Sequence, residues 1–167
     1  MIPPSPACRT EVARRADYRA FYENYHELYL LYAQARIPWS TAAADVVSAA
    51  FDDIAFVWTT ALSSPSAAAL AWGLLRQQVA GSALCPSCRP ACAHCVLRPA
   101  MADAVVLHAY IGISLSETAT VMGLNRGDIG ALLCGARRRL ADSHRLVRAM
   151  SHMGLHVQEG GDGRGSC

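Results

Sequence analysis

The sequence predicts an all-α protein with two small helical domains joined by a cysteine-rich linker. Apolar residues recur at helical spacing over residues 17–80 and again over residues 101–150. Between these units, residues 81–100 contain the run CPSCRPACAHC and several prolines, which disfavour a long helix. Residues 1–16 are expected to form a flexible arm, and the glycine-rich residues 151–167 a disordered tail. At 167 residues the chain is long enough for both units to enclose cores.

The composition indicates a folded cytoplasmic protein. Hydrophobic residues make up 53% of the chain, and the net charge of +2 is too small to indicate a nucleic-acid binder by itself. All strong bases are arginines, a bias that we attribute to a GC-rich genome. We find no signal peptide, and no apolar run approaches the ~20 residues that span a membrane. We therefore expect no membrane partner, and clustered cysteines in the cytoplasm are more often metal ligands or redox groups than disulfides.

The first predicted helix covers residues 17–34 and is rich in tyrosine. Phe21, Tyr25, Leu28 and Tyr32 form one stripe along it. Such a stripe can be a stacking surface for single-stranded nucleic acid. The regular spacing instead favours a buried stripe with hydroxyl groups at its rim.

Further helices are predicted over residues 41–61, 66–79 and 101–110 from the same helical spacing. Ser64 is expected to cap the second of these, with Pro65 at its first helical position. The apolar face of the helix over residues 41–61 is continuous and comprises Val47, Ala50, Phe51, Ile54 and Trp58.

Two helices joined by a tight turn are predicted in the second unit. Ser114 caps the first helix, and Glu117 completes a capping box. Gly123 suits the left-handed position that ends a helix. Asn125 caps the next helix, and Asp128 lies in its first turn, where a negative charge meets the helix dipole. The apolar face of that helix comprises Ile129, Leu132, Leu133, Ala136 and Leu140.

The second of these helices has a basic end at Arg137, Arg138 and Arg139. A helix, a glycine turn, a capped helix and a basic end together have the layout of a DNA-binding helix-turn-helix. An ordinary helical hairpin is the alternative, which the agreement of caps, turn and arginines disfavours. The arginines suit phosphate contacts, which position a protein on DNA without specifying sequence.

Four cysteines in the linker have the spacing of a metal site. Cys85, Cys88, Cys92 and Cys95 form CxxC-x3-CxxC, and two such turns can supply the four thiolates of a tetrahedral zinc site. An iron–sulfur cluster also takes four thiolates and is the first alternative. Thiols without a metal, reduced or reversibly paired, are the second. His94 can replace one of the cysteines as a ligand.

The order of these features resembles that of an alternative sigma factor of the extracytoplasmic-function type. The stretch ADVVSAAFDDIAFVW, which begins at Ala44, resembles part of region 2. The stretches GISLSETA, MGL and ARRRL, which begin at Gly112, Met122 and Ala136, resemble region 4. The resemblance covers most of residues 17–142 and implies a region 2-like helical bundle and a region 4-like helix-turn-helix.

The resemblance implies a transcription regulator with RNA polymerase core and promoter DNA as partners. An anti-sigma factor or another regulator is a further implied partner. The implied polymerase-binding residues are Asp45, Ser48, Ala49 and Asp52. The recognition helix begins at Arg126, and the implied DNA-binding residues are Asn125, Arg126, Asp128, Arg137, Arg138 and Arg139.

The sequence also bears on two other functional classes, an adaptor and an enzyme. The third region-2 helix of the family ends in a basic run that handles the melted strand, whereas this chain has only Arg76 there. The alternative is therefore a sigma-like adaptor that acts through protein contacts without opening promoters. An enzyme is not expected, because the sequence lacks a nucleophile–base pair, a phosphate-binding glycine loop and paired carboxylates at a recognisable spacing.

Overall fold

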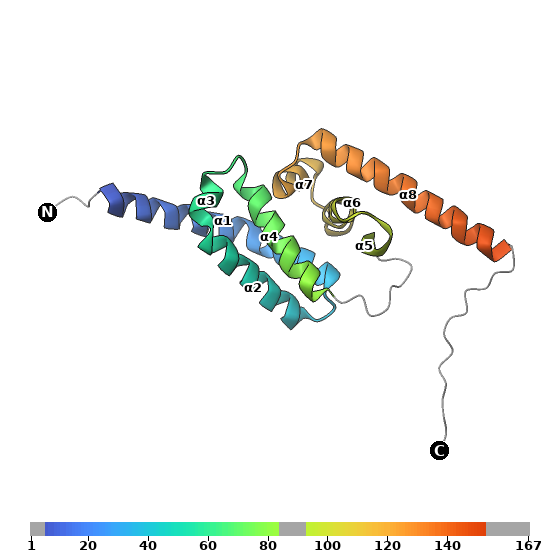
Figure 1. Ribbon diagram of the computed structural model, residues 1–167, viewed down its shortest axis with the longest axis horizontal. Coiled ribbons are helices and arrows are strands. Elements are labelled where there is room, and N and C mark those ends of the chain that lie inside the picture. Colours follow the sequence, from blue (N-terminus) through green and yellow to red (C-terminus); the bar gives the residue numbers. More distant parts are fainter. Residues whose placement is uncertain (1–5, 84–92, 153–167) are drawn as a thin grey trace, which may run out of the picture.

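The computed structural model describes the backbone of residues 6–83 and 93–152 and the side chains of residues 10–83 and 93–142. Within these ranges the chain is helical and has no strand, as Figure 1 shows, which confirms the predicted all-α class. The helices before the cysteine-rich segment are α1 Pro6–Arg36, α2 Ser40–Phe56, α3 Trp58–Leu62 and α4 Ala67–Ser82. Those after it are α5 Ala93–Val96, α6 Pro99–Val105, the π-helix η1 Val106–Ile111, α7 Leu115–Met122 and α8 Arg126–His152.

Helix α1 begins earlier than the sequence predicted. A flexible arm was expected over residues 1–16, whereas α1 starts at Pro6. Proline suits the first turn of a helix because its missing N–H has no intrahelical partner there. Glu11 then pairs with Arg14 and Arg15 three and four residues further on, a spacing that stabilises a helix surface.

The helix expected over residues 41–61 is divided into α2 and α3. Val57 lies between them with φ −97° and ψ 9°, in the bridge region of backbone space. Trp58 is buried beyond the break and packs edge-on against Tyr18, with ring centroids 5.5 Å apart. Phe56, directly before the break, is 92% exposed.

The N-cap of α4 lies two residues later than the sequence predicted. Ser66, and not Ser64, is the N-cap: its side chain accepts a hydrogen bond of 3.1 Å from the backbone N–H of Ala69. The Ser64 hydroxyl instead donates to the carbonyl of Ala61 at 2.7 Å, at the end of α3. Ser64 and Ser66 flank Pro65, and either serine could cap α4. The Ser64 hydroxyl is hydrogen-bonded at the end of α3, and Ser66 is the cap.

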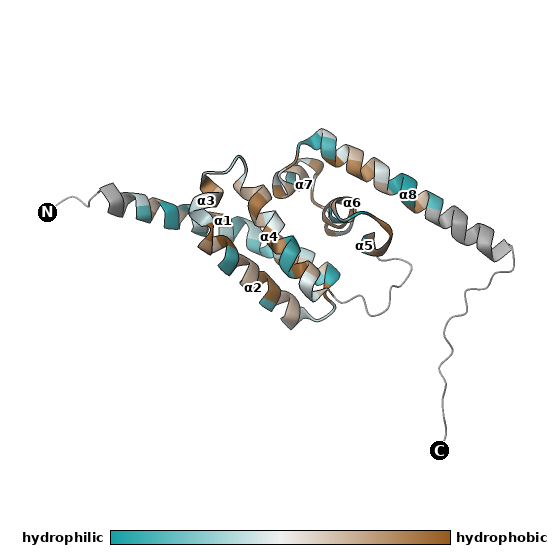
Figure 2. Ribbon diagram, in the orientation of Figure 1, coloured by the Kyte–Doolittle hydropathy of each residue, from teal (hydrophilic) through white to brown (hydrophobic). Residues whose placement is uncertain are grey.

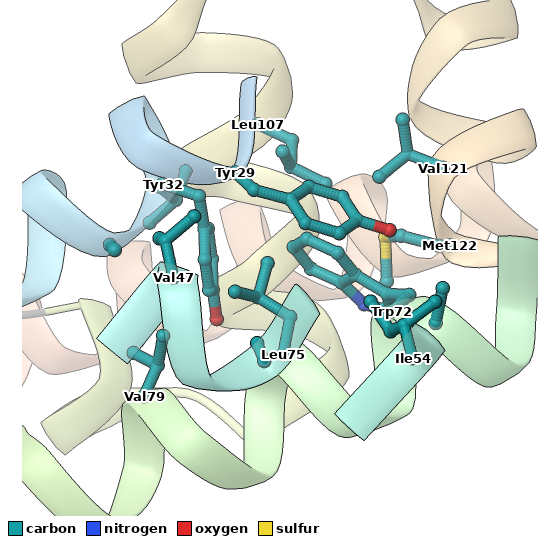
Figure 3. Packing of buried hydrophobic residues seen from close by; sticks show 14 of the residues in the cluster. Tyr29, Tyr32, Val47, Ile54, Trp72, Leu75, Val79, Leu107, Val121 and Met122 are labelled. Atoms are coloured by element: carbon teal, nitrogen blue, oxygen red, sulfur yellow. The ribbon is translucent and has the colours of Figure 1, made fainter. Parts of the chain in front are cut away.

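One large hydrophobic core lies among α1, α2 and α4, and Tyr32 is the one member of the predicted stripe that it buries fully, while the other three are half-buried. Tyr29 and Tyr32 have no exposed surface. Both rings approach Trp72 of α4, with centroid separations of 6.0 Å for Tyr29 and 4.6 Å for Tyr32 (Figure 3). Val47 and Ile54 of α2 pack beside them.

The same core extends into the second half of the chain. Leu107, Val121 and Met122 belong to the cluster that contains Trp72, and Figure 3 shows them around Tyr29 and Trp72. The helices before and after the cysteine-rich segment therefore share one core. A smaller cluster between α6 and α8 comprises Leu97, Met101, Ala102 and Ala136.

The turn of the helix-turn-helix touches α4 directly. A Cβ atom placed on Gly123 would lie 2.1 Å from the Ala69 Cβ and 2.7 Å from its Cα. No side chain fits in that space, so glycine is required by the packing as well as by its positive φ of 66°. This contact brings α7 onto α4.

Parts of the expected linker and tail are helical. Of the linker expected over residues 81–100, Ala93–Val96 forms α5 and Pro99 begins α6. Helix α8 runs to His152, just past the expected start of the tail. Residues 84–92 and 153–167 lie outside the described part of the chain. None of the described helices is both long enough and apolar enough to cross a membrane.

Candidate functional site

The first helix of the helix-turn-helix begins with the predicted capping box. The Ser114 side chain accepts from the backbone N–H of Glu117 at 3.1 Å, and the backbone N–H of Ser114 donates to the Glu117 carboxylate at 2.8 Å. These hydrogen bonds with Ser114 lower the pKa of Glu117, because they stabilise its charged form. The backbone N–H groups of Ser114 and Glu117 thus both find hydrogen-bond acceptors within three residues. Because these partners are local, the sequence alone could locate this helix.

The turn and the second cap also follow the prediction. Gly123 is left-handed, and the N–H of Leu124 donates to the carbonyl of Ala119 at 2.9 Å. The side-chain oxygen of Asn125 then accepts from the backbone N–H of Asp128 at 2.9 Å, and α8 begins at Arg126. The Asn125 oxygen therefore uses one of its two lone pairs to cap α8.

Helix α8 has an inner face and an outer face. Ile129 and Ala136 are buried, whereas all six predicted DNA-binding residues are exposed: Asn125, Arg126, Asp128, Arg137, Arg138 and Arg139. Figure 2 shows hydrophilic residues at the start of α8 and again further along it. The outer face between them carries small or apolar residues, namely Ala131 and Cys134. The long polar donors therefore lie in two groups along the helix.

The predicted polymerase-binding residues lie together on α2. Asp45, Ser48 and Asp52 are exposed, and Ala49 is half-buried among them. Their spacing of three and four residues places all of them on one face of the helix. Asp53 is different, since its carboxylate accepts a hydrogen bond of 2.6 Å from Gln78 of α4.

The predicted metal ligands are only partly within the described residues. Cys95 is exposed on α5, while Cys85, Cys88 and Cys92 lie in the segment outside them. His94 is half-buried beside Cys95, and its Nε2 lies 2.8 Å from Asp103 Oδ1. Among the described residues, no group of three or more histidine, cysteine or acidic side chains could hold a metal ion.

A buried carboxylate that sequence reasoning missed lies at the junction of the two halves. Asp103 of α6 is 1% exposed. Its Oδ1 accepts a hydrogen bond of 2.5 Å from the Tyr32 hydroxyl of α1 and lies 2.8 Å from His94 Nε2. Arg76 of α4 forms an ion pair with Oδ2 across 2.6 Å, without hydrogen-bond geometry. We call these four residues the Asp103 junction.

The Asp103 junction links α1, α4, α5 and α6 through one charge. Burial, and then the nearby Asp103 carboxylate, raise the pKa of Tyr32 well above its usual range, so that its hydroxyl stays protonated and donates. Arg36 is adjacent and donates to the Tyr32 oxygen at 3.3 Å. A lone acid within the apolar stretch from Met101 to Leu107 was the only sequence signal of this site.

Comparison with known proteins identifies no relative. No family model matches the chain, and neither a curated protein nor a solved structure is significantly similar to it.

Proposed function

We propose that this protein is a sigma-factor-like transcription regulator that binds RNA polymerase core and promoter DNA. The observation that carries the proposal is the helix-turn-helix of α7 and α8, with both caps, the left-handed glycine turn and an outward basic group. In such motifs the second helix enters the major groove. Arg137, Arg138 and Arg139 then contact phosphates, and Arg126 lies at the helix start, where base edges are read.

The exposed face of α2 supports the polymerase-binding part of the proposal. Asp45 and Asp52 are exposed on one face of α2, and their charge suits a basic partner surface. The proposed role is non-enzymatic: the protein acts by bringing a polymerase to DNA, with an anti-sigma factor or similar regulator as a further partner.

A specific observation favours the adaptor as a second candidate. Arg76 is the single basic residue of α4, and its ion pair with Asp103 competes with any contact to a phosphate. The shared core also holds α7 against α4. An adaptor of this kind binds polymerase core through α2 and does not open promoters.

We further propose that the cysteine cluster binds zinc, with an iron–sulfur cluster or unmetallated thiols as the alternatives. The donor chemistry fits zinc, because Cys85, Cys88, Cys92 and Cys95 supply four thiolates. If His94 replaces one of them, only its Nδ1 is available, since Nε2 faces Asp103. Protein purified without air is expected to contain about one zinc per chain and to be colourless. Brown protein with iron would support the cluster, and metal-free protein would contradict both sites.

DNA binding is tested by the salt dependence of affinity for a random-sequence duplex, measured by fluorescence anisotropy. Each phosphate neutralised adds about 0.9 to the slope of log affinity against log salt concentration. We expect Arg138→Ala to reduce that slope by about 0.9 and to weaken binding at every sequence alike.

The matched control is Arg19→Ala, which removes the same charge from an exposed position on α1. It is expected to leave the slope unchanged. Equal effects of the two substitutions would show that binding follows net charge and not the helix-turn-helix. Absence of duplex binding at 50 mM salt, together with binding to polymerase core, would favour the adaptor.

A further inference from the structure

A groove lies between the first half of α1 and the break that separates α2 from α3. Its volume is about 310 Å³, at the small end of the range for pockets that bind small molecules. Arg14 spans it, because its guanidinium donates a hydrogen bond of 3.0 Å to the Thr59 hydroxyl of α3. The Tyr18 hydroxyl is also engaged, since it donates to the carbonyl of Phe51 at 2.8 Å. These two bonds hold Arg14 and Tyr18 in place as walls of a preformed site.

The side chains that line the groove carry a net charge of +1. Its charged residues are two arginines, Arg14 and Arg15, and one acid, Glu11. Glu11 forms ion pairs with both arginines. Tyr18 adds no negative charge, because burial, and then the nearby Asp52 carboxylate, raise the pKa of its hydroxyl above the usual range. The lining therefore has a surplus of one positive charge, which suits an anion.

Arg15 is the arginine best placed to meet an anion. Its side chain is 79% exposed, and its Nε donates to Glu11 at 2.8 Å. Its two terminal nitrogens form no hydrogen bond within the part of the chain that the structure describes. They are therefore available for the paired hydrogen bonds that a guanidinium makes with a carboxylate. Arg14, which bonds both Glu11 and Thr59, contributes a fixed positive charge to the same groove.

Aromatic side chains form the apolar part of the groove. Tyr18, Phe56 and Trp58 all belong to its lining. Trp58 is buried and packs edge-on against Tyr18, whereas Phe56 is 92% exposed. An exposed ring at the edge of a pocket offers a planar face on which another ring can stack. A ligand that uses both parts of the groove has an aromatic ring and a negative charge.

We propose that this groove binds a small aromatic monocarboxylate. The carboxylate pairs with Arg15, and the ring stacks on Phe56 beside the Tyr18 wall. A single negative charge matches the surplus charge of the lining, and one ring with a short side chain suits a groove of this volume. A phosphate monoester carries almost two negative charges at neutral pH, and the second would be repelled by Glu11. None of the residues assigned above to DNA or polymerase lines the groove, so this inference is independent of the proposed function.

The test measures binding of phenylacetate to the full chain from the indole N–H signals in nitrogen–proton correlation spectra. We expect a Kd below about 1 mM. The Trp58 signal should shift, because Trp58 lines the groove, while the signal of Trp72 in the core should not. Shifts of Trp72 without Trp58 would place the ligand elsewhere and overturn the proposal.

Three further probes test the chemical class of the ligand. Acetate lacks the ring and phenethylamine has the opposite charge, so each should bind at least about tenfold more weakly than phenylacetate. Phenyl phosphate keeps the ring and carries the larger charge, and it should also bind more weakly. Tighter binding of phenyl phosphate than of phenylacetate would overturn the assignment to a monocarboxylate.

Arg15→Gln is expected to weaken phenylacetate binding about tenfold, because it removes the charge that meets the carboxylate. Arg19→Gln is the matched control. Arg19 is 81% exposed on the same helix and also bonds through Nε to a glutamate four residues away, but it lies outside the lining. It should change the affinity less than about twofold. Equal affinities of the two variants would contradict the role of Arg15.

Glu11→Gln should have the opposite effect. It removes the one carboxylate of the lining and leaves both arginines without their shared partner, so phenylacetate should bind at least about threefold more tightly. A purely structural role of Glu11 in α1 would not produce tighter binding. The melting temperature of each variant shows whether it is folded. No binding of phenylacetate to the wild type at about 10 mM, or weaker binding to folded Glu11→Gln, would overturn the proposal.

Discussion

Replacing Gly123 with alanine is expected to lower the free energy of unfolding by about 3 kcal/mol, from left-handed strain of roughly 1–2 kcal/mol and from overpacking. The strain arises because φ is +66°. The overpacking arises because the new Cβ would lie 2.1 Å from the Ala69 Cβ, a distance that only a shift of α7 away from α4 can relieve. Urea unfolding followed by circular dichroism measures the loss.

Gly112→Ala is the control that isolates the contact. Gly112 also has a positive φ, +88°, but no atom lies within 4 Å of a Cβ built there. Its substitution should therefore show the strain alone, roughly 1–2 kcal/mol. If the two glycines gave equal losses, the close approach of the turn to α4 would be wrong. Amide hydrogen exchange in α7 should increase in Gly123→Ala but not in Gly112→Ala.

Replacing Asp103 with alanine is expected to destabilise the protein by about 3 kcal/mol. The substitution leaves the buried Tyr32 hydroxyl and the half-buried His94 ring without their shared acceptor, and it leaves Arg76 without its counter-charge. Unpaired buried polar groups lose their hydration without compensation. The same urea titration measures the loss of unfolding free energy. Protection of the α1 and α6 amides from hydrogen exchange should fall together, since Asp103 joins these helices.

Two controls define the contribution of the charge. Asp103→Asn keeps an oxygen acceptor for Tyr32 and removes the charge. Its loss of unfolding free energy should be about half that of Asp103→Ala. Asp53→Ala removes an exposed acid that bonds only Gln78 among the described contacts, and it should cost less than about 1 kcal/mol. Equal losses at Asp103 and Asp53 would contradict the burial of the junction.

The helix-turn-helix could be predicted from the sequence because its determinants are local. Ser114 and Glu117 satisfy each other across one turn, Gly123 adopts a backbone conformation that other residues avoid, and Asn125 caps the next helix. Each of these interactions spans three or four residues, so both partners can be recognised in a short stretch of sequence. The exposure of Arg138 on α8 followed from the helical period in the same way.

The predictions that were wrong concern the boundaries of helices. Ser64 and Ser66 can both cap α4, and the turn after α3 engages Ser64. The break at Val57 has no glycine or proline to mark it, and its effect is visible only in the packing of Trp58 against Tyr18. Neither choice is decided by propensity, because the deciding contacts come from another helix.

The sequence by itself determined the helical class, the caps, the turn and the outward residues of α2 and α8, since these depend on neighbours a few positions away. Only the tertiary structure decided that both halves share one core, that Gly123 meets Ala69, and that Asp103 joins residues as distant as Tyr32. The physical reason is that burial and charge pairing depend on which helices meet. The period of one helix shows which face is apolar but not what covers that face.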